Sequence, residues 1–98
     1  MNYAFHPEAE REFIETAARY EAEIPGLGIR FAAEVNRAIE ILLENPKIGG
    51  PIAEELRHYV LRRFPHSVIY AVISDSLYVV AVAHGSRAPG YWQARVAE

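Results

Sequence analysis

The chain has 98 residues, a net charge of −3 and a hydrophobic content of 51%. This length indicates a single domain over residues 1–98, and the apolar content excludes a disordered protein. The apolar runs fall far short of the roughly 18 residues that span a bilayer, and the absence of cysteine excludes disulfides and thiol chemistry. Without an N-terminal signal sequence, we expect a cytoplasmic protein that does not enter a membrane.

The charge is distributed unevenly between the two halves of the chain. Residues 1–50 carry nine Glu against five Lys and Arg, whereas residues 51–98 carry four acidic residues against five Arg. A protein that grips a nucleic-acid backbone usually has a clear excess of basic residues. We therefore expect direct nucleic-acid binding to be weak.

The first half of the chain predicts one strand and two helices. Residues 2–6 have the pattern of a short strand, and Pro7 then occupies a position that is favoured in the first turn of a helix. Apolar residues at helical spacing predict one helix over residues 7–23 and a second helix over residues 27–44, which is stopped by Pro46. The short link between them implies an antiparallel helical hairpin.

The second half of the chain predicts a sheet. Residues 49–51 are expected to form a loop, and residues 52–56 a helical turn or more loop. Three strands are predicted, over residues 57–64, 67–73 and 77–84. A polar turn at residues 74–76 joins the last two strands, and residues 91–96 are expected to form a final helical turn. Since both faces of those two strands are largely apolar, we expect the helices to cover one face and another segment to cover part of the other.

These elements define an α+β domain: an N-terminal strand, a helical hairpin and then a three-stranded antiparallel meander, with the helices packed on one face of the sheet. The N-terminal strand is remote in sequence from the meander, so we expect it to join the sheet at an edge. The expected core residues are Phe13, Phe31, Val35, Leu42, Ile69 and Val80.

The order of several short motifs resembles the RelE/ParE family of bacterial toxins over nearly the whole chain. The motifs are Pro-Glu-Ala-Glu at residues 7–10, Leu-Glu-Asn-Pro-Lys-Ile-Gly at 43–49, Arg-Arg-Phe-Pro at 62–65 with Tyr70, and His-Gly-Ser-Arg at 84–87 followed by Tyr91-Trp92. The fold of that family agrees with the predicted order of elements. The resemblance implies a toxin that is held inactive by a cognate antitoxin.

The family contains two activities. RelE-like members are ribosome-dependent mRNA endonucleases, whereas ParE-like members poison DNA gyrase and are not known as nucleases. Metal-free RNA cleavage needs a group that accepts a proton, a group that donates one, and cations that hold the phosphate. The candidates for these roles are Arg62, Arg63, His84, Arg87 and Tyr91.

The basic and aromatic candidates also have structural interpretations. Arg62 and Arg63 are adjacent, so in a regular strand only one of them faces a given site, and both are interpreted as solvated cations at a strand edge. Arg87 either clamps a phosphate through two hydrogen bonds or pairs with an acidic side chain. Adjacent aromatic residues such as Tyr91 and Trp92 commonly divide their roles, one packing on the core and the other contacting a partner.

His84 is the candidate with an acid–base pKa in the neutral range. If the last strand is regular, His84 ends a face whose other members are apolar or aromatic, namely Tyr78, Val80 and Val82. A histidine in that position more often needs a hydrogen-bond partner than performs catalysis. We therefore interpret His84 as fixing the exit from the strand, with catalysis as the alternative.

The acidic balance and the single lysine, Lys47, favour the ParE-like interpretation, because RelE-like nucleases tend to be basic. The leading hypothesis is a toxin that poisons DNA gyrase through a contact surface of Arg62, Arg63, Arg87, Tyr91, Trp92 and Arg95. One alternative is a RelE-like endoribonuclease acting at the ribosome. A third is a member that has lost toxicity and persists as a module that binds its antitoxin.

The expected partner is an antitoxin that lays an amphipathic helix, and an added strand, across the toxin. The helical hairpin is expected to expose apolar positions outside its core stripe for this purpose: Ile14, Ala18, Ile29 and Ile39. No cofactor is expected. No metal site is expected either, because the histidines lack the spacing of metal ligands and no acidic cluster accompanies them.

Overall fold

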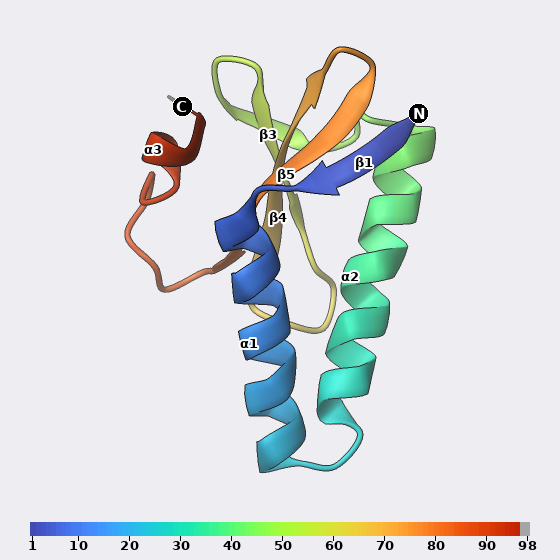
Figure 1. Ribbon diagram of the computed structural model, residues 1–98, viewed down its shortest axis with the longest axis vertical. Helices are drawn as coiled ribbons and strands as arrows, with labels where there is room; N and C mark the ends of the chain where they lie inside the picture. The colour runs from blue at the N-terminus through green and yellow to red at the C-terminus, as the bar shows by residue number, and fades with distance from the viewer. Residues whose placement is uncertain (97–98) are drawn as a thin grey trace.

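The structure, a computed structural model, describes residues 1–96 of the chain. An N-terminal strand, β1 (Asn2–Phe5), leads into two antiparallel helices, α1 (Pro7–Glu23) and α2 (Leu27–Glu44). The four later strands are β2 (Gly50–Ala53), β3 (Leu56–Val60), β4 (His66–Ile73) and β5 (Ser76–His84), and a short helix α3 (Gln93–Val96) follows. The two long helices lie against one face of the sheet, while α3 lies on the side away from α2 (Figure 1). This arrangement confirms the predicted α+β architecture.

Local signals place both long helices within the predicted bounds. His6 caps α1, because its Nδ1 accepts a hydrogen bond of 3.0 Å from the Glu8 backbone N–H. At the other end of the hairpin, the Glu21 carboxylate accepts hydrogen bonds from the Gly26 N–H at 2.8 Å and the Gly28 N–H at 3.0 Å. These bonds, the Gly26 bond foremost, outweigh the effect of desolvation and lower the pKa of Glu21. The carboxylate of one helix therefore caps the N-terminus of the next.

The sheet has five strands in the order β1-β5-β4-β3-β2. The N-terminal strand β1 lies at one edge, parallel to β5, and the other pairs are antiparallel. The edge position of β1 confirms the prediction. The strand β2 was not predicted: it pairs with β3 where only a loop or a helical turn was expected. Pro51 hid this strand, and proline is tolerated there because β2 is an edge strand.

The predicted strand over residues 57–64 was too long, because β3 ends at Val60. After Val60 the chain leaves the sheet in a bend, and the backbone N–H groups of Arg62 and Arg63 both donate to Oε2 of Glu34 on α2. The Glu34 carboxylate thus accepts two backbone hydrogen bonds that a neighbouring strand would otherwise accept. Arg62 and Arg63 therefore belong to a loop, and the argument from alternating strand faces does not apply to them.

A β-bulge between β4 and β5 changes which side chains share a face. Ile69 pairs with Ala81 but Tyr70 pairs with Val79, so Val80 is the extra residue. Val80 and Ala81 both pack on the sheet face opposite the long helices, whereas Val82 packs on the helix-covered face. The expected common face of Tyr78, Val80, Val82 and His84 was therefore wrong. The bulge moves His84 to the side on which α1 lies.

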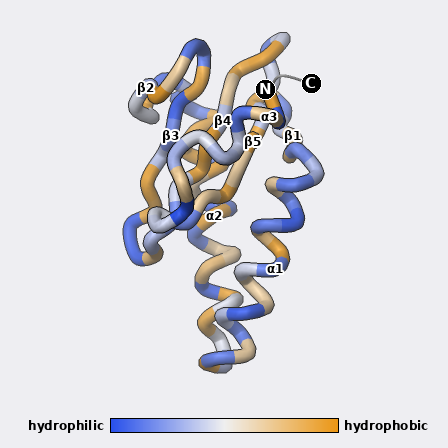
Figure 2. The backbone as a smooth tube through the Cα atoms, turned by 90° about the vertical axis from the view of Figure 1, so that its left-hand side faces the viewer, coloured by the Kyte–Doolittle hydropathy of each residue, from blue (hydrophilic) through white to orange (hydrophobic). Residues whose placement is uncertain are grey.

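Each sheet face carries its own apolar cluster. Phe31, Val35 and Leu42 of α2 are fully buried between the helices and the sheet. On the opposite face, Trp92 covers a cluster that includes Ile69 and Val80, which confirms that a further segment covers part of this face. The predicted core is confirmed except for Phe13, which is half-buried and packs against the first cluster. Hydrophobic residues follow the strands closely, while the helices alternate between hydrophilic and hydrophobic positions (Figure 2).

Candidate functional site

Arg62 and Arg63 lie beside a groove between α2 and the loop that follows β3, with a volume of about 530 Å³. The apolar side chains that line it are mostly buried or half-buried, among them Tyr59, Leu61 and Phe64. Four exposed arginines also line this arginine groove: Arg30, Arg37, Arg62 and Arg63. Glu34 is the one acidic residue among its described lining residues, and its carboxylate already accepts two backbone hydrogen bonds. The groove therefore combines an apolar interior with a basic border.

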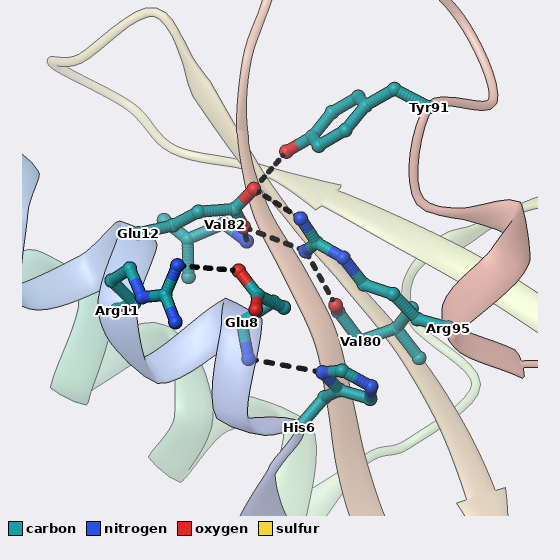
Figure 3. A network of polar contacts seen from close by, with 8 residues as sticks. All are labelled: His6, Glu8, Arg11, Glu12, Val80, Val82, Tyr91 and Arg95. Carbon is teal, nitrogen blue, oxygen red and sulfur yellow. Dashed lines mark hydrogen bonds and ion pairs between the residues drawn. The ribbon is translucent and has the colours of Figure 1, made fainter. Parts of the chain in front are cut away.

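A second group of polar residues holds the C-terminal segment against the domain (Figure 3). Its centre is Glu12 of α1, whose carboxylate accepts a hydrogen bond of 2.7 Å from the Tyr91 hydroxyl. Arg95 donates to the same carboxylate from its two terminal guanidinium nitrogens, from Nη1 at 3.0 Å and from Nη2 at 2.8 Å. The Val82 backbone N–H also donates to Glu12, and Arg95 donates to the Val80 carbonyl. These contacts, here called the Glu12 latch, join the helix, the last strand and the C-terminal segment.

The latch is charged and partly buried. Burial alone raises the pKa of Glu12, but the hydrogen bonds from Arg95, Tyr91 and Val82 outweigh it, and the net effect is a lowered pKa. Burial, with the neighbouring Glu12 carboxylate, raises the pKa of Tyr91 above its ordinary value. The hydrogen bond to Glu12 likewise raises the pKa of Arg95. Glu12 is therefore ionised and Tyr91 protonated at neutral pH, so the Tyr91 hydroxyl is already committed to an internal hydrogen bond.

Two residues predicted to contact a target instead support the fold. Trp92 is only 7% exposed and packs in the cluster on the outer sheet face. The Arg95 guanidinium forms an ion pair with Glu12 inside the domain. Trp92 packs on the core, as expected for one of the two adjacent aromatics, and the Tyr91 hydroxyl is held by the latch. Arg87 remains exposed, with its guanidinium carbon 3.8 Å from the centre of the Tyr91 ring.

His84 and Arg87 line a cleft of about 360 Å³ between α1 and the ends of β4 and β5. The cleft also contains His66, which the sequence analysis did not single out. The two imidazole rings meet edge to face, with their centroids 4.9 Å apart. His66 is 2% exposed and its Nδ1 has no hydrogen-bond partner among the described residues. We call this site the histidine cleft.

The two histidines differ in burial and in hydrogen bonding. Burial, followed by the charges of His84 and Arg19, lowers the pKa of His66 to about 4, so its ring is neutral at physiological pH. Nδ1 of His84 accepts a hydrogen bond of 2.9 Å from the Ser86 backbone N–H. Because a backbone N–H can only donate, the proton of a neutral His84 ring must be on Nε2. The predicted structural role for His84 at the strand exit is consistent with this bond.

The structure divides the candidate nuclease residues between these sites. Arg62 and Arg63 line the arginine groove, whereas His84 and Arg87 line the histidine cleft; Tyr91 lies beside that cleft, since Arg87 packs on its ring and its partner Glu12 also lines the cleft. Three residues that organise these sites were not predicted from the sequence. The carboxylates of Glu12 and Glu34 accept hydrogen bonds, and His66 packs against His84. Glu12 and Glu34 are ordinary helix residues with no motif around them, and His66 follows the Arg-Arg-Phe-Pro motif without being part of it.

The positions predicted to bind the antitoxin differ in exposure. Ile14 is 60% exposed and Ile29 is 70% exposed, and Ala18 is exposed one helical turn after Ile14. Ile39 is only 2% exposed and belongs to the core. The expectation that Ile39 is a surface residue was wrong, because α2 is covered over a wider arc than a single stripe.

Residues 1–96 contain no group of three or more histidine, aspartate or glutamate side chains arranged to hold a metal ion. Within the same residues, no helix is both long enough and apolar enough to cross a membrane.

Comparison with known families gives one match over most of the chain. The family model described as the ParE toxin of the type II toxin-antitoxin system, parDE, matches residues 3–89. A search of curated protein sequences gives no match.

Several solved structures share the fold. The chromosomal ParDE toxin–antitoxin system from P. aeruginosa contains a chain that is 17% identical, with a TM-score of 0.75 over 86% of this chain and 95% of that one. The isolated E. coli RelE toxin is 19% identical, with a TM-score of 0.66 over 95% of this chain and 93% of that one. An E. coli RelE double mutant in complex with an antitoxin RelBc peptide is 18% identical, with a TM-score of 0.61 over 95% of this chain and 92% of that one. At these identities the likeness establishes the fold.

Proposed function

Since the chain belongs to the family of ParE toxins of type II toxin–antitoxin systems, we propose that it inhibits growth by binding DNA gyrase and that a cognate antitoxin neutralises it. The proposed mode of action is inhibitory binding to a protein target, without catalysis by the toxin itself. The alternative to be tested against it is RNA cleavage at the ribosome.

The observation that carries this proposal is the separation of the candidate nuclease groups. General acid–base cleavage of RNA requires the proton-transferring groups and the phosphate-binding cations to lie within hydrogen-bond reach of one phosphodiester. Here His84 and Arg87 share one cavity, with Tyr91 beside Arg87, but Arg62 and Arg63 line a different one, so the five candidate groups do not converge on a single site. The Tyr91 hydroxyl is donated to Glu12, so it is not available to the substrate in this conformation.

The outer face of the sheet supports the same conclusion. Its buried side chains are aliphatic or aromatic, and Trp92 covers them. Ile69, Ala71 and Ala81 in that cluster offer neither a proton nor a positive charge. A nuclease that used this face would need cations or proton donors there. The net charge of −3 also argues against tight binding to a nucleic-acid backbone.

The surface that remains for a protein target centres on Arg62 and Arg63. Both are exposed at the border of the arginine groove, and arginine is enriched among the residues that dominate binding energy at protein interfaces. Arg87 is a further exposed candidate. Trp92 and Arg95 contribute indirectly, by holding the C-terminal segment in place.

The arginine groove is also the best site for the antitoxin. An amphipathic helix with acidic residues beside an apolar stripe would place that stripe over Tyr59, Leu61 and Phe64 and its carboxylates near the arginines. Such a segment would cover Arg62 and Arg63, which explains how antitoxin binding would block contact with the target. The exposed Ile14, Ala18 and Ile29 would serve as a second, apolar contact area.

The experiment compares the double variant Arg62→Gln/Arg63→Gln with Arg11→Gln, which removes one exposed charge from α1. The double variant is expected to abolish growth inhibition and the block of gyrase supercoiling while keeping the thermal stability of the wild type. Arg11→Gln is expected to remain toxic. Purified wild-type toxin should leave ribosome-bound mRNA intact. Site-specific cuts in translated mRNA, lost on changing Arg87 or Tyr91, would overturn the proposal in favour of the nuclease.

A further inference from the structure

The histidine cleft has features that neither the fold nor the proposed toxin activity requires. Its inner surface includes the buried residues Thr16, His66 and Val82, and its outer border includes the exposed Arg19 and Arg87. A polar cleft is costly to maintain, because buried polar atoms without partners destabilise a fold. His66 carries such an atom, the unpartnered Nδ1. An unsatisfied buried group of this kind marks the inner end of the cleft as polar.

The charges around the cleft favour an anion. Neither Arg19 nor Arg87 forms an ion pair within the described part of the chain, although Arg87 rests on the Tyr91 ring. Of the two acidic residues that line the cleft, Glu12 is neutralised by its pair with Arg95 at 2.8 Å. Only Glu15 faces the cleft as an unpaired carboxylate. Two free guanidinium groups therefore oppose one free carboxylate.

Neutral hydrogen-bond donors complete the lining. With its Nδ1 occupied by the Ser86 N–H, His84 has its proton on Nε2 and can donate it to a ligand. The Thr16 hydroxyl also lies at the cleft, whereas the Ser86 hydroxyl lies 2.8 Å from His84 Nδ1 and donates its proton there. Donors that approach from helix α1, from β5 and from the segment after it would surround a tetrahedral anion with several acceptor oxygens better than a flat carboxylate. Because the inner end of the cleft is closed by buried residues, a terminal group fits it better than one in the middle of a chain.

From this combination we propose that the histidine cleft binds a terminal phosphate group, such as the phosphate monoester of a nucleotide. Arg19 and Arg87 hold the charged oxygens, and Nε2 of His84 and the Thr16 hydroxyl complete the hydrogen bonds. This site is separate from the arginine groove. Arg87 is shared with the proposed target surface, but Arg19, Thr16 and His84 belong to this cleft alone, so the effect of Arg19→Gln on phosphate binding tests the cleft separately from gyrase inhibition.

The test titrates the purified protein at low salt with adenosine 5′-monophosphate and, separately, with inorganic phosphate. Two-dimensional NMR spectra monitor each titration. Both probes are expected to give saturable shifts of the Ser86 and Arg87 amides and of the His84 ring. A short single-stranded oligonucleotide with 5′- and 3′-hydroxyl ends is the third probe, and it is expected to leave these signals unchanged. Shifts from the oligonucleotide without shifts from the monoester would overturn the proposal.

Matched variants separate a built site from general electrostatic attraction. Arg19→Gln and Arg87→Gln should each weaken binding about tenfold, the effect of losing one hydrogen-bonded charge. Glu15→Gln should strengthen binding about two- to fivefold by removing the unpaired carboxylate. Arg30→Gln removes the same charge from the arginine groove and should leave the affinity within about twofold. The proposal is refuted if Arg30→Gln weakens binding as much as Arg19→Gln, or if no saturable shift appears with either phosphate probe.

Discussion

The Glu12 latch predicts a large loss of stability for the substitution Glu12→Ala. The change removes the acceptor for the Tyr91 hydroxyl, both Arg95 nitrogens and the Val82 N–H. It also leaves the Arg95 guanidinium without its carboxylate partner, although the Arg95 side chain is only 13% exposed. Removing one partner of a buried ion pair costs about 3–5 kcal/mol, and the partial exposure of this pair reduces that figure. We expect a loss of about 3 kcal/mol, out of the roughly 5–15 kcal/mol that stabilises a small domain.

Urea unfolding monitored by the fluorescence of Trp92, the single tryptophan, measures this loss directly. Trp92 sits in the segment that the latch holds, so its emission reports both local release and global unfolding. The control is Glu15→Ala, three residues along the same helix, at an exposed position. It should change the free energy of unfolding by less than about 0.5 kcal/mol. A cost below about 1 kcal/mol for Glu12→Ala, or an equal cost for Glu15→Ala, would refute the assigned role of the latch.

The same substitution has a pH signature. The pKa of Glu12 in the folded protein is lowered from the ordinary 4.5, so the unfolded chain binds a proton more readily than the folded one. The latch therefore contributes its full stability above about pH 4.5 and loses it as the pH falls through the folded pKa. Below about pH 4.5, the free energy of unfolding should therefore fall less steeply with decreasing pH in Glu12→Ala than in the wild type. An unchanged acid profile would contradict this assignment.

Three further substitutions test the packing. Trp92→Ala should cost about 3–5 kcal/mol in chemical denaturation followed by circular dichroism, because Trp92 covers the outer sheet face; a cost below about 1 kcal/mol would show that it is dispensable there. Gly28→Ala should cost about 1–3 kcal/mol, since the new Cβ would lie 2.2 Å from the Ala17 carbonyl oxygen; Gly85→Ala, with its nearest neighbour at 3.5 Å, is the tolerated control. Burial, together with the charges of His84 and Arg19, lowers the pKa of His66 from 6.5 to about 4, so the unfolded chain takes up this proton first as the pH falls. The wild type should therefore lose up to about 3 kcal/mol of stability between pH 6.5 and about 4, and His66→Phe should remove that loss. An unchanged pH profile would argue against a buried neutral imidazole.

Several features of this domain were determined by the sequence alone. The two long helices follow from the spacing of apolar residues, from Pro7 at the first turn and from Pro46 after the second. These signals are reliable because helical hydrogen bonds and caps connect residues only a few positions apart. The β4–β5 pair, apolar on both faces, and the edge position of β1 were equally accessible. Among the candidate functional residues, exposed Arg62, Arg63 and Arg87 were also identified, because charge is visible without coordinates.

Other features were decided only by the tertiary structure. The strand β2 exists because β3 offers it a partner, and the bulge at Val80 exists only in the pairing of two strands. That single extra residue reverses the sheet face of His84 and thereby places it beside His66.

The Glu12 latch is the clearest case of a feature that the sequence could not predict. It joins residues 70, 79 and 83 positions apart in sequence. Nothing local distinguished Glu12 from the other eight glutamates of the first half of the chain. A side chain's partners depend on which elements pack together, and long-range packing is set by the whole core rather than by neighbours in sequence. For that reason the sequence indicated which residues carry charge and aromatic surface, but the fold decided that Trp92 and Arg95 stabilise the domain while the two arginines after β3 remain free to contact a partner.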